Sequence, residues 1–273
     1  MSNENWDGLG VRSLPTSQEM EASFLDSLTI DYGPLQLLGR FFSSVDAYLM
    51  DRGITVALAR IEEALNIHLR NTDSWHSFPP MLDPRIAEIN EDRSYCFVCR
   101  NKAGDEIAVM AGRIYDTPGS LADSIADQSF IYGRLGRATD RTRFETWAPS
   151  APNITAPFSY IGALWVRPDF RGSKFARFLP PLTRAYALAK WNIRYDVGLV
   201  SDEMARAGMP LVYGYSHVED GFRAHGLADG ADVTGSVLWM DVNELVEQLR
   251  AVLVERLSQT HDGIVDRAAN DHA

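Results

Sequence analysis

Three things are scarce in this sequence: cysteine, long apolar runs and positive charge. Its 273 residues include only two cysteines, and 26 basic residues stand against 37 acidic ones. A transmembrane helix needs about 20 consecutive apolar residues, and no run in the chain approaches that length. The N-terminal stretch MSNENWDGLGVRS lacks the basic start and apolar block of a signal peptide. We therefore expect no membrane association and a cytoplasmic protein.

The shortage of basic residues gives the chain a formal net charge of -11. Proteins that coat nucleic acids usually present a basic surface, so we expect no nucleic-acid partner. The 45% hydrophobic and 23% charged fractions are ordinary for a soluble globular protein. The chain is therefore expected to fold, and any basic site must be local.

The two cysteines, Cys96 and Cys99, lie in the segment CFVC. If this segment is a strand, residues three apart point to opposite faces, which argues against a disulfide between them. No second Cys or Cys/His pair completes a zinc site. We expect two inert buried thiols, no bound metal and a reducing environment.

Apolar periodicity predicts how the chain is organised. We expect an irregular N-terminal arm at 1–33, one domain at 34–258 with a core at 94–241 and an insertion at 117–157, and a flexible tail at 259–273. The predicted helices cover 35–50, 54–69, 121–135, 175–191 and 201–208, with a last helix capped by Asp241 and Glu244. The predicted strands cover 94–101, 106–116, 160–166, 195–200, 215–220 and 235–241. This order indicates an α+β, or mixed α/β, fold.

A basic corner, WVRPDFRGSKFARF at 165–178, joins a predicted strand to a predicted helix. Its basic residues are Arg167, Arg171, Lys174 and Arg177. The first N–H groups of a helix have no intrahelical partner, and together with the helix dipole they attract anions. Gly172 would let the backbone approach a ligand closely. The pattern predicts a phosphate or pyrophosphate site, and the alternative is a capped helix with solvated basic residues.

The same corner resembles the acetyl-CoA-binding signature of the GCN5-related N-acetyltransferase family. In that family the pattern Arg/Gln-x-x-Gly-x-Gly/Ala opens the helix after a strand. Arg171 fills the first position and Ala176 the last, whereas Lys174 stands where the middle glycine is expected. The side chain of Lys174 would either crowd the pyrophosphate or pair with a phosphate.

The order of the predicted strands between Ser94 and Asp241 is similar to that of the same family. The resemblance implies a central, mostly antiparallel, twisted sheet of about six or seven strands, flanked by helices. Here it would carry extra N-terminal helices and a C-terminal helix. The family also opens a gap between its fourth and fifth strands, which correspond to 160–166 and 195–200.

The resemblance implies that the cofactor is acetyl-CoA or another acyl-CoA. Its pyrophosphate would bind backbone N–H groups from Arg171 to Ala176, and its pantetheine arm would pair with the backbone of 163–166. The residues expected to bind the cofactor are Trp165, Val166, Arg171, Gly172, Ser173, Lys174, Phe175 and Ala176.

Acyl transfer to an amine needs a base for the amine proton and an acid for the departing thiolate. The family often takes its base from the fourth or fifth strand. The end of 195–200 offers Asp202 and Glu203, of which we favour Glu203, although both could simply begin a helix. The family's acid is a tyrosine before the sixth strand, and here we favour Tyr213 over Tyr215. His217 is a further candidate because histidine titrates near neutral pH.

The resemblance therefore implies an acyl-CoA-dependent N-acyltransferase that acts on an amine of a small molecule or a protein. The acidic balance of the chain favours a cationic acceptor such as a polyamine, an aminoglycoside or a lysine side chain. Walls for the acceptor are expected from Tyr132, Phe144, Glu145 and Trp147 of the insertion, and from the helices before the hairpin at 94–116. A homodimer is left open. The alternatives are a non-catalytic CoA-binding, regulatory or assembly module, and an unrelated α+β domain that binds phosphate.

Overall fold

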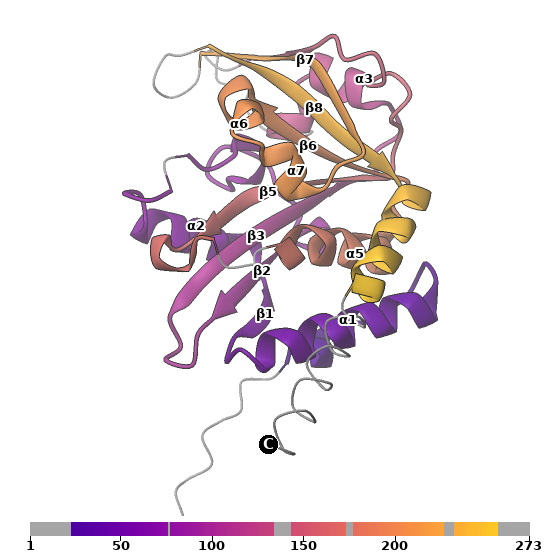
Figure 1. Ribbon diagram of the computed structural model, residues 1–273. Helices are drawn as coiled ribbons and strands as arrows, with labels where there is room; N and C mark the ends of the chain where they lie inside the picture. Colours follow the sequence, from indigo (N-terminus) through magenta and orange to yellow (C-terminus); the bar gives the residue numbers. More distant parts are fainter. Residues whose placement is uncertain (1–22, 76, 134–142, 173–176, 227–231, 256–273) are drawn as a thin grey trace, which may run out of the picture.

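The computed structural model describes residues 23–75, 77–133, 143–172, 177–226 and 232–255 (Figure 1). In these residues one mixed sheet of eight strands has the order β1-β2-β3-β5-β6-β8-β7-β4. The strands are β1 (Thr55–Ala59), β2 (Ser94–Arg100), β3 (Glu106–Tyr115), β4 (Arg143–Thr146), β5 (Phe158–Val166), β6 (Tyr195–Ser201), β7 (His217–His225) and β8 (Val233–Asp241). All neighbours are antiparallel except the parallel pair β5 and β6. The predicted α+β class with a mostly antiparallel sheet is confirmed.

Helices cover both faces of this sheet. They are α1 (Leu35–Met50), α2 (Ile61–Arg70), α3 (Leu121–Ala126), α4 (Ser129–Tyr132), α5 (Leu179–Trp191), α6 (Asp202–Arg206), α7 (Met209–Tyr213) and a C-terminal helix over residues 242–255. Short 3-10 turns are η1 (Phe24–Ser27), η2 (Pro80–Leu82), η3 (Glu91–Arg93) and η4 (Pro168–Phe170). None of the helices within the described ranges has the length and apolar character needed to span a bilayer.

The hydrophobic core has two layers, one on each face of the sheet. On one face the core is formed with α1, α5 and the C-terminal helix, and on the other with α2, α3 and α4 (Figure 1). Cys99 belongs to the first layer and Cys96 to the second. The predicted opposite orientation is therefore confirmed. Burial raises the pKa of both thiols to about 12, which keeps them protonated and unreactive.

Helix α1 matches the predicted range because Leu38, Phe41, Phe42, Val45 and Leu49 share one buried face. The prediction of a single helix over 54–69 is wrong. Its first part is strand β1, and α2 begins only at Ile61, after an extended Arg60. The β-branched residues at 54–56 fit a strand better than a helix, and β1 pairs along its length with β2.

The prediction of one helix over 121–135 is also wrong, because α3 and α4 are separated by Gln128, which has φ 65°. The insertion then supplies β4, which pairs with β7 at the outer edge of the sheet. The strands β1 and β4 bring the sheet to eight strands, where six or seven were expected. The insertion is therefore part of the sheet as well as a connection.

Residues 23–33, the described part of the predicted arm, pack on the body of the protein. The side chain of Phe24 is only 1% exposed, and the amides of Asp31 and Tyr32 donate to the carbonyl of Ala189. Helix α5 begins at Leu179 and not at 175, with Pro180 and Pro181 in its first turn. Proline is tolerated there because first-turn N–H groups have no helical partner. Residues 173–176 lie outside the described residues.

Candidate functional site

The parallel strands β5 and β6 pair only over their first residues. Phe158, Ser159 and Tyr160 are opposite Tyr195, Asp196 and Val197, and the pairing then stops although both strands continue. Further along, each strand keeps its other neighbour, β3 for β5 and β8 for β6. The two strands therefore part in the middle of the sheet, which confirms the gap expected from the family resemblance.

Strand β5 carries a bulge beside this gap. Its register against β3 shifts between Val109 and Ala111, at the point where Ala163 adopts φ 54°. This left-handed conformation is uncommon for a residue with a side chain. Bulges of this kind redirect side chains and backbone groups and often lie next to active sites. Nothing in the sequence around Ala163 signalled it.

The hydroxyl of Tyr213 lies at this bulge. Tyr213 ends α7 and is 6% exposed. Burial raises the pKa of its phenol to about 12, while a hydrogen bond with the backbone of Leu164 and the charge of Arg184 act in the opposite direction. The phenol stays protonated at neutral pH and retains a proton to give.

A second phenol, that of Tyr160, lies along β5 on the α2 side. Its ring packs over Gly162, where an added Cβ would come within 2.8 Å of the Tyr160 hydroxyl oxygen. Burial raises the pKa of Tyr160 well above its usual value, and the nearby Tyr213 raises it further. Tyr160 and Tyr213 belong to opposite core layers, so the two phenols approach the bulge from both faces. Sequence reasoning missed Tyr160, because it looks like an ordinary strand residue.

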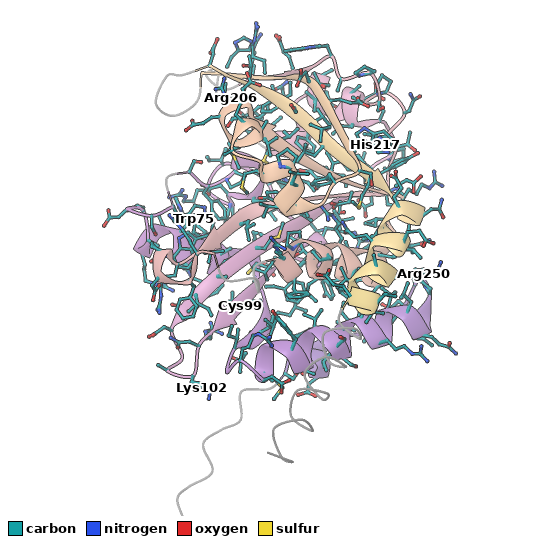
Figure 2. The ribbon with its side chains drawn as sticks, in the orientation of Figure 1. Trp75, Cys99, Lys102, Arg206, His217 and Arg250 are labelled. Atoms are coloured by element: carbon teal, nitrogen blue, oxygen red, sulfur yellow. The ribbon has the colours of Figure 1, made fainter. Side chains whose placement is uncertain are left out.

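The end of β5 is fixed by contacts with the loop after α2. The indole Nε1 of Trp165 donates to Ser74 Oγ at 3.1 Å, and the Trp165 ring stacks on Trp75 with centroids 5.7 Å apart (Figure 2 labels Trp75). The guanidinium of Arg171 donates to the carbonyl of Val166 at 3.1 Å and to that of Ser74 at 2.8 Å. Arg171 therefore ties the corner to the end of β5.

The basic corner is only partly described. Gly172 is exposed with φ 80°, and a Cβ added there would meet no atom of the described residues within 4 Å. The amide of Arg171 donates to the carbonyl of Pro168 at 3.3 Å. Arg167 is bonded to Asp169 and Asp105. The expected cofactor-binding residues Ser173, Lys174, Phe175 and Ala176 lie outside the described residues.

Glu203 lies in the first turn of α6, directly after β6, and its side chain is exposed. Because β5 and β6 are parallel, it is at the same end of the sheet as Trp165 and Val166. Asp202 accepts a hydrogen bond from the Thr234 hydroxyl, and Ser201 caps the helix. Both acids stand at a helix N-terminus, where negative charge is stabilising.

The other candidates have structural contacts. The ring of Tyr215 lies under the Arg184 guanidinium, at 4.1 Å from its centroid. His217 (Figure 2) stacks on Trp239 at 3.8 Å and contacts Glu244 of the C-terminal helix at 2.8 Å. Glu244 and Asp241 also form the predicted capping box.

The residues expected to line an acceptor site are divided between core and surface. Tyr132 and Phe144 are buried in the α2-side core layer. Glu145 contacts His225 at 3.5 Å, and Trp147 is 55% exposed next to Arg223. Of these four residues, only Glu145 and Trp147 present surface to solvent. Within the described residues, no group of three or more His, Cys, Asp or Glu could hold a metal ion.

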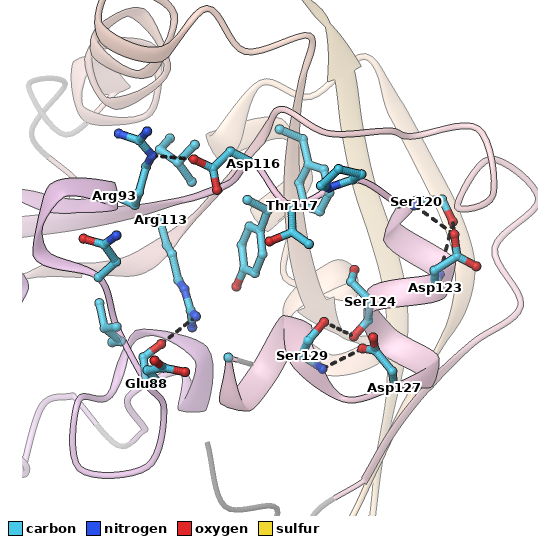
Figure 3. A pocket seen from close by; sticks show the side chains of 18 residues that line it. Glu88, Arg93, Arg113, Asp116, Thr117, Ser120, Asp123, Ser124, Asp127 and Ser129 are labelled. Atoms are coloured by element: carbon cyan, nitrogen blue, oxygen red, sulfur yellow. Dashed lines mark hydrogen bonds and ion pairs between the residues drawn. The ribbon is translucent and has the colours of Figure 1, made fainter. Parts of the chain in front are cut away.

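A separate cavity of about 520 Å³ lies at the opposite end of β5, next to Phe158 (Figure 3). Its wall includes Asp116, Asp123 and Asp127, and Arg113, whose guanidinium donates to the carbonyls of Met81 and Glu88. At about 3.3 Å per residue, Phe158 and Val166 are roughly 26 Å apart along the strand. The cavity is therefore distinct from the gap between β5 and β6.

Comparison with known proteins gave no matching family model and no matching curated protein sequence. Similar solved structures include a mutant of the spermidine N-acetyltransferase SpeG from Vibrio cholerae, with 13% identity and a TM-score of 0.40 over 71% of this chain and 97% of that one. They also include NAA60 from Arabidopsis thaliana in complex with acetyl-CoA, with 16% identity and a TM-score of 0.40 over 70% of this chain and 99% of that one.

Proposed function

We propose that this chain is an acyl-CoA-dependent N-acyltransferase that transfers an acetyl group from acetyl-CoA to an amine. One observation carries the proposal: β5 and β6 part after three residue pairs, directly beside the bulge at Ala163. The buried phenol of Tyr213, which interacts with the backbone of Leu164, lies next to this bulge. An acyl donor held in this gap would bring its carbonyl close to a protonated phenol.

The groups along the gap fit an acyl-CoA. Beyond Tyr160 and Val197, the facing edges of β5 and β6 are not paired with each other. Their backbone groups can therefore hydrogen-bond the two amides of a pantetheine arm, in the way that an added strand is bound. A Cβ added at Gly172 would meet no atom of the described part of the chain within 4 Å, which suits a backbone that approaches a pyrophosphate. Trp165 and Val166 end the strand, and Arg171 to Ala176 would bind the diphosphate.

In the proposed reaction the amine nitrogen attacks the thioester carbonyl, a C–N bond forms and the C–S bond breaks. The amine loses a proton to Glu203, directly or through water, and the departing thiolate takes one from Tyr213. Glu203 is exposed and stands in the first turn of α6, where an acid also stabilises the helix. The acceptor would be a small-molecule or protein amine, and the acidic chain favours a cationic one.

One observation favours a second candidate, a CoA-binding module without catalysis. The Arg171 guanidinium donates hydrogen bonds to two backbone carbonyls of the protein, so these donors are not directed at a ligand. The two functions are separated by two measurements on the full chain. Calorimetry with acetyl-CoA tests binding, and thiol release over a panel of polyamines, aminoglycosides and lysine or N-terminal peptides tests transfer.

We expect saturable binding of acetyl-CoA and thiol release that depends on the amine. Binding without release by any amine would favour the module. A chain that binds neither acetyl-CoA nor CoA would contradict both functions and favour an unrelated α+β domain.

A further inference from the structure

Arg184 is a charged side chain without any exposed surface, in the middle of α5. Burying a guanidinium costs several kcal/mol unless it is paired and hydrogen-bonded. Even then, a buried ion pair is often no more stabilising than apolar residues of similar volume. The burial of Arg184 therefore points to a role beyond stability, and its contacts indicate which.

One side of the guanidinium is bonded to β6 at the place where β5 and β6 part. Its Nε donates to Asp196 Oδ2 at 2.7 Å, and both residues are fully buried. The other oxygen of Asp196 accepts a hydrogen bond from the hydroxyl of Ser159. Ser159 and Asp196 are opposite one another in the short parallel ladder of β5 and β6. Arg184 thus fixes α5 to both strands just before they part.

The other side of the guanidinium holds the end of α7. Its Nη1 donates to the backbone carbonyl of Tyr213 at 2.7 Å and to Gln248 Oε1 at 3.1 Å. The amide of Gln248 donates in turn to the carbonyl of Gly214 at 2.6 Å. The side chains of Arg184 and Gln248 therefore fix the backbone at Tyr213 and Gly214. This is the backbone that carries the phenol beside the bulge.

We propose that Arg184 is a positioning residue that sets the hydroxyl of Tyr213 at a fixed place relative to the gap between β5 and β6. A single guanidinium connects the root of the gap, through Asp196 and Ser159, to the backbone of the tyrosine beside it. Because the bond is to the main chain of Tyr213, losing it displaces the whole residue. This inference rests on the proposed transferase function and on Tyr213 as its acid.

A double-mutant cycle tests it, with Arg184→Lys, Tyr213→Phe and both together, in the full chain with acetyl-CoA and the best amine. Lysine keeps the charge for Asp196 but lacks the second arm that reaches the Tyr213 carbonyl. Tyr213→Phe should lower kcat on the order of 10²-fold, the usual contribution of a general acid. Arg184→Lys should lower kcat about tenfold, as a small misplacement of a catalytic group does, with little change in KM for acetyl-CoA. The double variant should be no slower than Tyr213→Phe alone.

The matched control is Arg113→Lys. Arg113 is also buried and also donates to backbone carbonyls, but it lines the cavity at the far end of β5. Its substitution should lower stability without lowering kcat selectively, and any loss should multiply with that of Tyr213→Phe. If the losses from Arg184→Lys and Tyr213→Phe also multiply, Arg184 is only structural and the inference is wrong.

Two further measurements decide the remaining cases. If Arg184→Lys does not fold, Gln248→Leu replaces it, because Gln248 is half-buried and contacts both Arg184 and Gly214. If no amine supports transfer, the proposed function fails, but the NMR signal of Tyr213 labelled at Cζ still reports its position. That signal should shift in Arg184→Lys and not in Arg113→Lys, and an unchanged signal would overturn the inference.

Discussion

At the scale of one residue, burial keeps the phenol of Tyr213 protonated. A free tyrosine titrates near 10, whereas burial raises the pKa of Tyr213 to about 12. The phenol is therefore protonated throughout the range in which amines become nucleophilic. Its activity as an acid is lost only as pH rises through the raised value.

For the pH profile we expect kcat of the wild-type chain to stay level on the alkaline side up to at least about pH 9, because a group that titrates near 12 is still protonated there. Tyr213→Phe should lower that level without changing its shape. Steady-state thiol release across the pH range measures this. An alkaline limb in the wild type well below pH 9, absent in Tyr213→Phe, would contradict the assigned pKa.

At the basic corner, Gly172→Ala should weaken acetyl-CoA binding about tenfold. Alanine prefers negative φ by roughly 1–2 kcal/mol. Binding would therefore have to restore the φ of 80° observed for Gly172, and that cost weakens it. Gly104→Ala is the control, since Gly104 has φ 83°, lies in the β2–β3 turn, and also has no neighbour near an added Cβ. Calorimetry should show weakened binding only for Gly172→Ala. Equal effects would mean that the corner has no special role.

Long elements with a clearly bounded apolar pattern could be predicted from the sequence, and short or irregular ones could not. Helix α1 was foreseen because its apolar residues follow the helical period, and strands β2, β3, β5, β6 and β8 were foreseen because each is a largely apolar run bounded by turn or polar residues. The strand β1 was missed because its apolar residues run directly into those of α2. The left-handed residues Gln128 and Ala163 were missed because neither residue type signals positive φ.

For the candidate site the limit was long-range pairing. The gap was anticipated through the family resemblance, and Tyr213 was singled out from its place before the predicted β7. The connection of Arg184 with Asp196 and the carbonyl of Tyr213 depends on residues brought together from α5, β6 and α7. In the sequence Arg184 looks like the polar face of an amphipathic helix. Burial of a charge is visible only once the partners are placed.

At the scale of a strand, the bulge in β5 should respond to side-chain branching at Ala163. Ala163→Gly should leave stability unchanged or raise it by about 1 kcal/mol, since glycine adopts positive φ without strain. Ala163→Val should cost about 2 kcal/mol or more and lower kcat, because a β-branched residue is an outlier there. Urea unfolding and thiol release measure the two effects. Equal behaviour of the two variants would contradict a bulge that depends on φ.

At the scale of the whole molecule, the insertion is joined to the sheet by Glu219 of β7. Its carboxylate accepts hydrogen bonds from the amide of Ser150 at 2.9 Å, the hydroxyl of Ser150 at 2.6 Å and the indole of Trp239 at 3.0 Å. Burial alone would raise the pKa of Glu219, but these bonds outweigh it and lower the pKa from the usual 4.5. The carboxylate form therefore stabilises the fold.

Because the folded pKa is lowered, this stabilisation is present above about pH 4.5 and is lost as pH falls through the folded value. Glu219→Gln should lower the free energy of unfolding by about 1–2 kcal/mol at neutral pH. The NH₂ group of glutamine would face N–H and O–H groups that need an acceptor. The difference from wild type should shrink in acid. Urea unfolding at neutral and acidic pH measures it, and a difference independent of pH would contradict the role of the charge.

The division of the sheet has a consequence for hydrogen exchange. Three residue pairs connect the block β1-β2-β3-β5 to the block β6-β8-β7-β4, so amides on the facing edges beyond Tyr160 and Val197 have no cross-strand shelter. These amides should exchange with deuterium faster than those on the outer sides of the same two strands. A molecule bound between β5 and β6 would form hydrogen bonds with these amides and slow their exchange. Slower exchange at these amides would therefore report that the gap between β5 and β6 is occupied.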